Sequence, residues 1–258
     1  MTRPPINMAS IMKVQFLGVN FEVGTHEAIF KRLQGLVRGS GSDSTVIMHG
    51  NLNTVYTSAR VRALRVALQH PSALVLFEGI GLKLARWLTA RVLWPDISGT
   101  ELVPLFLARC ADRPVRLALV GGRDGVAYAA ARALTQQYSN VVVVKTLNGF
   151  SDLSDEPRAW GCIAQARPDV VLLGLGTPLQ EVKAVAFAQA TGVPIVWCVG
   201  GLFDLLAGVK QRAPAWILMC RIEWLWRLVR HPRHYWHRTF VQGPWLVGQV
   251  LRLWGGER

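Results

Sequence analysis

The stretch from Pro168 to Glu181 has the residue types and the spacing of a site for a diphosphate. Its apolar run, Val170 to Leu173, predicts a strand that is buried on both faces, and Gly174 and Gly176 then allow a tight turn. Pro178 suits the first turn of a helix. Free N–H groups and the positive end of a helix dipole gather at such a point, which favours an anion. The alternative is a tight strand-to-helix turn that binds nothing.

Polar side chains follow the other apolar runs in the same way, each at the point where a strand is expected to end. Because the carboxyl ends of parallel strands lie along one edge of a sheet, these positions predict a shared pocket. The positions are Asn51 and Asn53, Glu78, the run from Gly121 to Gly125, Thr177 and Gln180, and Asp204.

Apolar runs of strand length alternate with helical patterns along most of the chain, which predicts an α/β fold with a mainly parallel sheet. The expected strands are residues 14–18, 45–48, 73–77, 115–120, 141–145, 170–173 and 194–199. The expected helices include residues 25–37, 54–69, 126–138 and 156–166, and three in the C-terminal region at 216–230, 232–240 and 245–254. We divide the chain into a leader, 1–13, a core, 14–206, and a basic appendage rich in tryptophan, 207–258.

The appendage combines tryptophan with arginine on short amphipathic helices, a composition typical of segments that lie in the headgroup region of a membrane. Two alternatives stay open: the tryptophans pack the appendage on the core while the arginines are solvated, or arginine and aromatic rings bind nucleic acid. His231, His234 and His237 could hold a metal, but no carboxylate stands beside them, and we expect polar interfacial histidines.

The overall composition favours an anionic partner, because the formal net charge is +13 although only 17% of the residues are charged. Hydrophobic residues make up 51% of the chain, which is ample for a packed core. The four cysteines are far apart, which fits a reducing compartment without disulfides or a zinc site. We see no secretory signal and no apolar run of the length that crosses a bilayer.

Several of these motifs together resemble the WecG/TagA/CpsF glycosyltransferase family. The similarity is carried by the run from Gly174 to Glu181, like the family's Gly-x-Gly-x-Pro-x-Gln-Glu, and by the runs 200–208, 212–214 and 223–228 with Pro232 and Arg233. Earlier in the chain, Asn51-Leu52-Asn53 is similar to the family's Thr-x-Asn, and Glu78-Gly79-Ile80-Gly81 is similar to its Asp-Gly-x-Gly.

The resemblance implies a Rossmann-like fold with helices on both faces of the sheet and a C-terminal helical appendage that associates with the membrane. It implies an inverting, metal-independent transfer from a UDP-sugar to a polyprenyl-diphosphate-linked saccharide at the cytoplasmic face, with no cofactor. Glu78 stands where that family has its proposed catalytic base. We assign donor binding to Asn51, Asn53, Gly174, Gly176, Thr177, Gln180 and Asp204, and binding of the acceptor's diphosphate to Arg227, Arg233 and Arg238.

Four positions depart from the family pattern, and one of them is His234, which stands near a position where Arg is common. Glu78 replaces Asp and reaches about one methylene further, Asn51 replaces Thr, and Asp96 stands where Arg is usual. These changes suggest a divergent branch that serves exopolysaccharide synthesis. They also leave open a non-catalytic scaffold at the membrane surface. A nucleic-acid-binding protein is a further alternative, suggested by charge alone.

Overall fold

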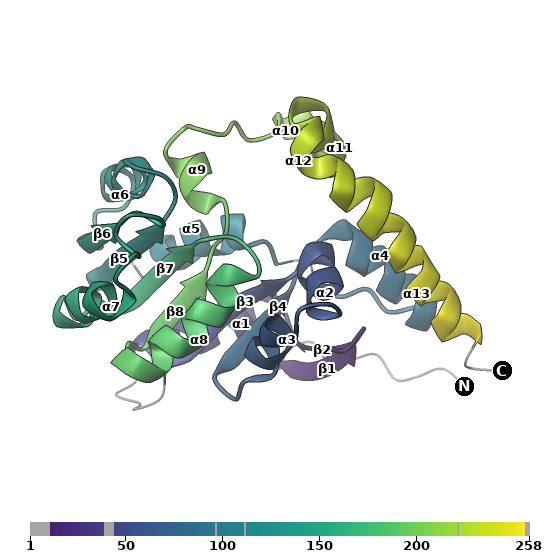
Figure 1. The fold of residues 1–258 in the computed structure, drawn as a ribbon, viewed down its shortest axis with the longest axis horizontal. Helices are drawn as coiled ribbons and strands as arrows, with labels where there is room; N and C mark the ends of the chain where they lie inside the picture. The colour runs from purple at the N-terminus through teal and green to yellow at the C-terminus, as the bar shows by residue number, and fades with distance from the viewer. Residues whose placement is uncertain (1–10, 39–43, 96, 111, 221, 256–258) are drawn as a thin grey trace.

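The computed structural model describes residues 11–38, 44–95, 97–110, 112–220 and 222–255, and within them eight strands form one sheet (Figure 1). Across the sheet the order is β1-β2-β4-β3-β8-β7-β5-β6. β1 and β2 form an antiparallel hairpin at one edge, and every other neighbouring pair is parallel. The strands are β1 (Met12–Phe16), β2 (Val19–Val23), β3 (Thr45–Gly50), β4 (Ala73–Phe77), β5 (Val115–Gly121), β6 (Val141–Leu147), β7 (Val170–Gly174) and β8 (Ile195–Cys198).

Helices cover both faces of this sheet, because the parallel connections must cross over it. One face packs against α2 (Leu52–Ser58), α3 (Arg62–Gln69), α4 (Ile80–Ala90), α7 (Glu156–Gln165) and α8 (Leu179–Thr191). The other packs against α1 (His26–Arg38), α5 (Gly99–Arg109), α6 (Val126–Gln137) and α9 (Leu202–Leu206).

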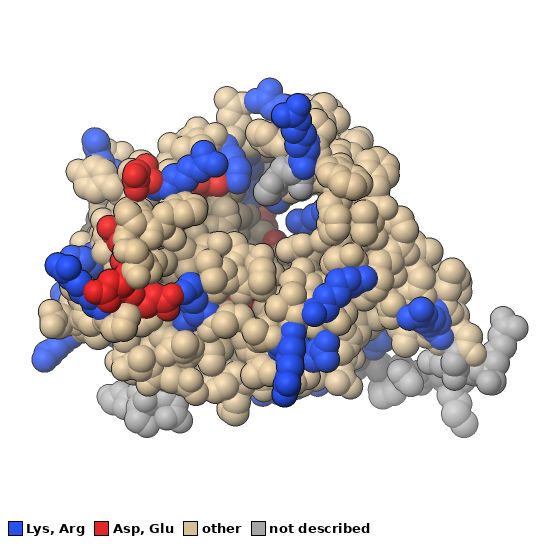
Figure 2. All heavy atoms as spheres, in the orientation of Figure 1, with Lys and Arg blue, Asp and Glu red and all other residues tan. Residues whose placement is uncertain are grey.

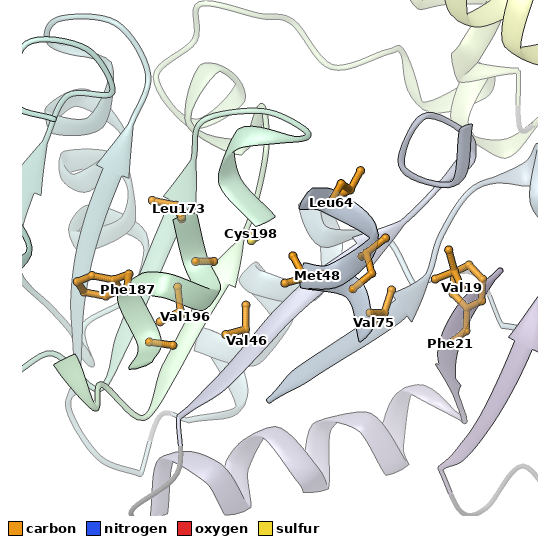
Figure 3. Packing of buried hydrophobic residues seen from close by; sticks show 14 of the residues in the cluster. Val19, Phe21, Val46, Met48, Leu64, Val75, Leu173, Phe187, Val196 and Cys198 are labelled. Carbon is orange, nitrogen blue, oxygen red and sulfur yellow. The ribbon is translucent and has the colours of Figure 1, made fainter. Parts of the chain in front are cut away.

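Alternate residues of each central strand face opposite sides, so each strand contributes to two hydrophobic clusters. On β3, Val46 and Met48 face the side of α3 and α8, whereas Ile47 faces the side of α1 and α5. Figure 3 shows the first of these clusters, in which Met48 and Phe187 are packed with residues of β4, β7 and β8. The central strands are therefore buried on both faces, and their polar neighbours can lie only at the strand ends.

The C-terminal segment consists of α10 (Ala215–Met219), α11 (Glu223–Arg230), α12 (Pro232–His237), the π-helical turn η1 (Arg238–Gln242) and α13 (Gly243–Gly255). α13 lies along α4, where Leu246 and Val250 join the hydrophobic core and Trp254 donates from Nε1 to the Leu88 carbonyl at 3.1 Å. Figure 1 shows α10 to α12 at the end of α13 that is remote from the C-terminus, across from α9. No helix in the described ranges is long and apolar enough to cross a bilayer.

The predicted α/β class, with a mainly parallel sheet and helices on both faces, is confirmed. Two expected helices were wrong, and one strand was not expected. The hairpin strand β2 was missed. The helix expected at 54–69 is two helices, α2 and α3, and the one expected at 216–230 is α10 and α11. Residues 59–61 interrupt the helix expected at 54–69, and Arg65 donates to the carbonyls of Ser58 and Ala59 at this interruption. Asp96 lies outside the described residues.

Candidate active site

A pocket of about 440 Å³ lies where the carboxyl ends of β3, β4, β7 and β8 face the C-terminal segment. Its floor is made by residues that end or follow these strands, and its other wall is made by α11, α12 and η1. Figure 2 shows the hollow from one side, with acidic atoms deep inside it and Lys or Arg atoms around its opening. Of the residues assigned from sequence, Asn51, Glu78, Thr177, Gln180, Arg227 and Arg238 line it.

Glu78 lies on the floor of the pocket directly after β4, with its side chain 26% exposed. Its amide donates to the Gly50 carbonyl at 3.1 Å, which extends the pairing of β3 and β4 to the end of both strands. Ser98 Oγ donates to Glu78 Oε1 at 3.4 Å, and the Ser98 hydroxyl is 2.8 Å from that of Thr100. The carboxylate is thus held on a sheet edge and remains open to the pocket.

His49, the penultimate residue of β3, lies behind Glu78 and is buried. The indole Nε1 of Trp197 donates to its Nε2 at 3.0 Å. Because an indole N–H can only donate, Nε2 carries the lone pair and Nδ1 carries the proton. Nδ1 lies 3.3 Å from the Ile97 carbonyl and 3.5 Å from Glu78 Oε2.

The imidazole of His49 is neutral in this environment. Burial lowers its pKa to about 4, and the hydrogen bond to the Ile97 carbonyl offsets only part of that shift. The contact with Glu78 is therefore a neutral donor facing a carboxylate and not an ion pair. Gly99 is required here, since a Cβ at that position would lie 2.8 Å from His49 Nε2.

The loop after β7 is held by Gln180 from inside the first turn of α8. Its Oε1 accepts from the amide of Gly176 at 3.2 Å and from that of Gly200 at 3.1 Å, which ties the loops after β7 and β8 together. Its Nε2 donates to Glu181 Oε1 at 2.9 Å, and Thr177 Oγ1 donates to the same oxygen. Burial raises the pKa of Glu181. Both polar atoms of the Gln180 side chain are thus hydrogen-bonded within the protein, where they hold the loops that line the pocket.

Gly174 is not among the residues that line the pocket. It ends β7 in close contact with the segment that follows β8. A Cβ there would lie 2.9 Å from the Gly200 carbonyl oxygen and 3.0 Å from the ring of Phe203. Gly176 has φ of +78°, a conformation that glycine adopts most readily. The two glycines assigned to donor binding therefore shape the turn that carries Thr177 into the pocket.

Three other assigned residues lie outside the pocket lining because each is engaged elsewhere or turned outward. Asn53 accepts from Gln242 Nε2 at 2.7 Å and so joins α2 to η1, while the neighbouring Asn51 caps α2. Asp204 pairs with Lys210 at 2.6 Å. Arg233 is exposed on α12. Sequence spacing placed these residues near the site but could not give the direction of their side chains.

Two arginines of the C-terminal segment bring positive charge to the carboxylate on the floor. Arg227 pairs with Glu223 at 2.6 Å. Burial pulls the pKa of Arg227 down, but the charges of Glu223 and, more weakly, Glu78 raise it overall. For Arg238 burial is the larger effect and lowers the pKa, with Glu78 acting in the opposite direction and Arg227 in the same one. A carboxylate and two guanidinium groups thus face one cavity. The carboxylate can accept a proton, and the two guanidinium groups can bind an anion.

The comparison with known families agrees with this geometry. The model of the glycosyl transferase WecG/TagA/CpsF family matches residues 14–258, which is nearly the whole chain. The chain belongs to this family. Its members are glycosyltransferases, and the match includes both the sheet with the Gly174 loop and the C-terminal segment that completes the pocket.

Two relatives share the printed name N-acetylglucosaminyldiphosphoundecaprenol N-acetyl-beta-D-mannosaminyltransferase. The protein of Bacillus subtilis (strain 168) is 27% identical over 161 residues, 62% of this chain and 62% of that protein. The chain thus matches less than two thirds of that relative's length. The protein of Staphylococcus aureus (strain NCTC 8325 / PS 47) is 26% identical over 215 residues, 83% of this chain and 84% of the relative.

Several pocket residues of this family member were not assigned from sequence. His49 was placed directly after the second expected strand without a role, and Arg230, His231 and Tyr235 were placed in a membrane-facing appendage, whereas all four line the pocket. The signal for His49 was available, since it directly precedes the polar cluster at Gly50 and Asn51. The others could not be found by periodicity, because their role depends on how the C-terminal segment docks.

The described residues contain no group of three or more His, Cys, Asp or Glu side chains that could hold a metal ion. Of the three spaced histidines, His231 ends α11 beside the pocket, and the ring of His237 packs edge-on against Tyr56. The side chain of His234 lies outside the description. Metal-independent transfer stays a prediction.

Proposed function

We propose that this protein transfers a sugar from a UDP-sugar to a saccharide linked to polyprenyl diphosphate, with inversion at the anomeric carbon and without a metal. The observation that carries the proposal is the position of Glu78, whose carboxylate lies on the floor of a pocket that also contains Arg227 and Arg238. Family membership supports the reaction class, and the names of the two relatives support a lipid-diphosphate acceptor.

In the proposed reaction an acceptor hydroxyl attacks the anomeric carbon of the donor sugar. Glu78 takes the proton of that hydroxyl, a new C–O bond forms, and the bond between the anomeric carbon and the UDP oxygen breaks with its electron pair leaving on UDP. Attack from the face opposite the leaving group inverts the centre in one step. The carboxylate is open to the cavity and held by Ser98, as a general base requires.

The donor diphosphate is assigned to the loops after β7 and β8, where Thr177, Gly200 and Gly201 line the pocket. The N-terminus of α8 points its dipole toward this region. Gln180 supports the site by holding both loops, and Lys210 adds a cation at its rim.

The acceptor diphosphate is assigned to Arg227 and Arg238, because planar guanidinium groups suit phosphate oxygens and these two line the same pocket as Glu78. Arg233 is exposed outside the lining and is better placed to meet a membrane or the outer part of the acceptor. Without a metal, these cations would have to offset the charge that gathers at the reacting centre.

We further propose that the protein works at the cytoplasmic face of the cell membrane as a peripheral protein. On α13, Val247, Leu251 and Trp254 are exposed at the spacing of one helical stripe. The adjacent α4 exposes Ile80, Leu84 and Trp87 at the same spacing. Such side chains beside basic residues favour an anionic bilayer.

The experiment that tests the proposed function is a transfer assay with a panel of UDP-sugars and a synthetic lipid-diphosphate N-acetylglucosamine. UDP-N-acetylmannosamine belongs in the panel because of the relatives' names, and UDP-hexoses belong there because of the exopolysaccharide branch inferred from sequence. We expect a UDP-releasing transfer that persists in EDTA. No transfer from any donor, together with intact vesicle binding, would favour the alternative of a non-catalytic scaffold.

A further inference from the structure

We infer that His49 is the positioning residue of Glu78: its Nδ1–H, fixed in place by Trp197, orients the Glu78 carboxylate and stabilises its ionised form. The inference rests on the proposed function, in which Glu78 is the base, and adds a residue that the family motifs do not include. The juxtaposition that carries it is the chain of contacts from the Trp197 indole through the His49 imidazole to Glu78 Oε2.

The direction of the His49 proton follows from its surroundings. Trp197 is completely buried and packs edge-on against Phe106. Its indole N–H can act only as a donor, so the atom that it contacts must be an acceptor. That acceptor is His49 Nε2, so the single proton of the neutral ring lies on Nδ1. The opposite tautomer would place two N–H groups against each other at Nε2 and would leave a lone pair facing two oxygens.

The proton on Nδ1 faces the Ile97 carbonyl at 3.3 Å and Glu78 Oε2 at 3.5 Å. The Ile97 carbonyl accepts this proton, and Glu78 Oε2 lies beside the same N–H at the outer limit of hydrogen-bond distance. Contacts of this kind often shorten when substrate fills the site. A neutral donor suits this position, because a charged imidazolium would form an ion pair with Glu78 and weaken it as a base.

Other charged groups also act on Glu78, and they come from other elements. Arg227 of α11 and Arg238 of η1 are close enough for their charges to interact with it, while Glu223 and Tyr235 act on the same two arginines. The Ser98 hydroxyl contacts Oε1. His49 differs from Ser98 in contacting the other carboxylate oxygen, Oε2, and it does so from the end of β3.

The test uses a matched pair of variants of the full chain. In His49→Asn the side-chain amide can place an N–H near the position of Nδ1, whereas in His49→Leu no donor remains. The ¹³C resonance of the Glu78 carboxyl group, assigned by its absence in Glu78→Gln, reports the Glu78 titration directly. We expect the midpoint to rise by about 1 pH unit in His49→Leu and to stay near the wild-type value in His49→Asn.

The pH dependence of kcat/KM should follow the same order, with the acidic limb moved upward in His49→Leu and restored in His49→Asn. An unchanged Glu78 midpoint in His49→Leu, or a midpoint that moves without the acidic limb, would overturn the inference. Should His49→Leu fail to fold, His49→Phe, which also lacks a donor, replaces it with the same expected rise. ¹⁵N chemical shifts of the wild type should show His49 as the Nδ1–H tautomer at neutral pH, and the Nε2–H tautomer would overturn the inference.

Failure of the proposed function would be visible separately. A wild-type protein that transfers no sugar would still give the carboxyl titration and the imidazole tautomer, because neither measurement needs a substrate.

Discussion

A guanidinium group that is shielded from water and lies next to a second guanidinium is costly unless an anion joins it. Arg238 is in this position: burial lowers its pKa, and Arg227 adds to that effect. Among the described residues Glu78 is the carboxylate whose charge acts on it most, and that carboxylate is needed for the proposed chemistry. A diphosphate would satisfy both arginines.

The first prediction concerns Arg238. In Arg238→Gln we expect the KM for the lipid acceptor to rise by about 10- to 100-fold, because a charged hydrogen bond contributes roughly 1.5–3 kcal/mol. The KM for the UDP-sugar should change much less. Arg158→Gln, at an exposed position on α7, is the matched control. A change confined to the donor KM would move Arg238 to the donor subsite.

The second prediction concerns His49 and the pH dependence of stability. Its pKa is about 4 in the folded protein and 6.5 in the reference state, so the unfolded chain binds the proton first as the pH falls. The contribution of the buried, neutral His49 to the free energy of unfolding is complete above about pH 6.5 and is lost as the pH falls toward 4. Between pH 7 and pH 5, urea unfolding should show about 2 kcal/mol more loss for the wild type than for His49→Asn. Parallel losses would contradict the burial of a neutral histidine.

At this scale the sequence could identify Glu78, Thr177 and Gln180, because each stands beside a strand end or glycine turn that fixes its place. It could not predict that Gln180 uses its carbonyl oxygen to hold two loops, since the second loop lies 20 residues away at Gly200. Nor could it predict His49, whose role depends on Trp197 of another strand.

The pocket wall made by α11, α12 and η1 depends on how η1 is attached to α2. Gln242 is buried and donates to Asn53 at 2.7 Å, and beside this contact Tyr56 packs edge-on against Trp245 at 5.3 Å. Arg60 lies over the Tyr56 ring at 3.6 Å. These contacts hold the segment that carries Arg238 against the sheet edge that carries Glu78.

The third prediction is a double-mutant cycle across this attachment. Asn53→Ala and Gln242→Ala should each destabilise the protein, and the double variant should lose about 1 kcal/mol less than the sum of the two. Urea unfolding measures the cycle, and hydrogen exchange should show faster opening of η1 in each single variant. Simple additivity would mean that the two amides do not support each other.

Element boundaries were predicted well where apolar runs were bounded by glycine or proline, as for β4 and α7. Boundaries were predicted poorly where side-chain contacts, and not glycine or proline, determine where a helix ends. α2 and α3 were joined in the prediction because residues 59–61 contain no proline or glycine. The interruption is stabilised by Arg65, which donates to two carbonyls of the turn, and this contact is invisible in a periodicity pattern.

Over the whole molecule, α13 and the adjacent α4 both present exposed apolar side chains. The fold class followed from the alternation of strands and helices. The docking of the C-terminal segment onto the sheet edge did not, because the sequence shows an amphipathic segment without showing which of its side chains face the pocket.

The fourth prediction tests the membrane-facing role of α13. Leu251→Glu should weaken binding to vesicles that contain anionic lipid by about 10-fold or more, since it replaces an exposed apolar side chain that would enter the bilayer with a charge that the headgroups repel. Co-sedimentation measures the effect, and raised salt should weaken the wild type as well. Val66→Glu, at an exposed position on α3, is the control. Equal binding of wild type and Leu251→Glu would contradict this orientation.

The measurement that tests the account most directly is transfer by Glu78→Gln from the best UDP-sugar to the lipid-diphosphate acceptor. The amide has nearly the same shape as the carboxylate but cannot accept the proton, so we predict a fall in kcat of about 10²- to 10⁴-fold. Thermal stabilisation by the UDP-sugar should persist. If Glu78→Gln keeps wild-type turnover while the wild type transfers sugar, Glu78 is not the base and the central claim is wrong.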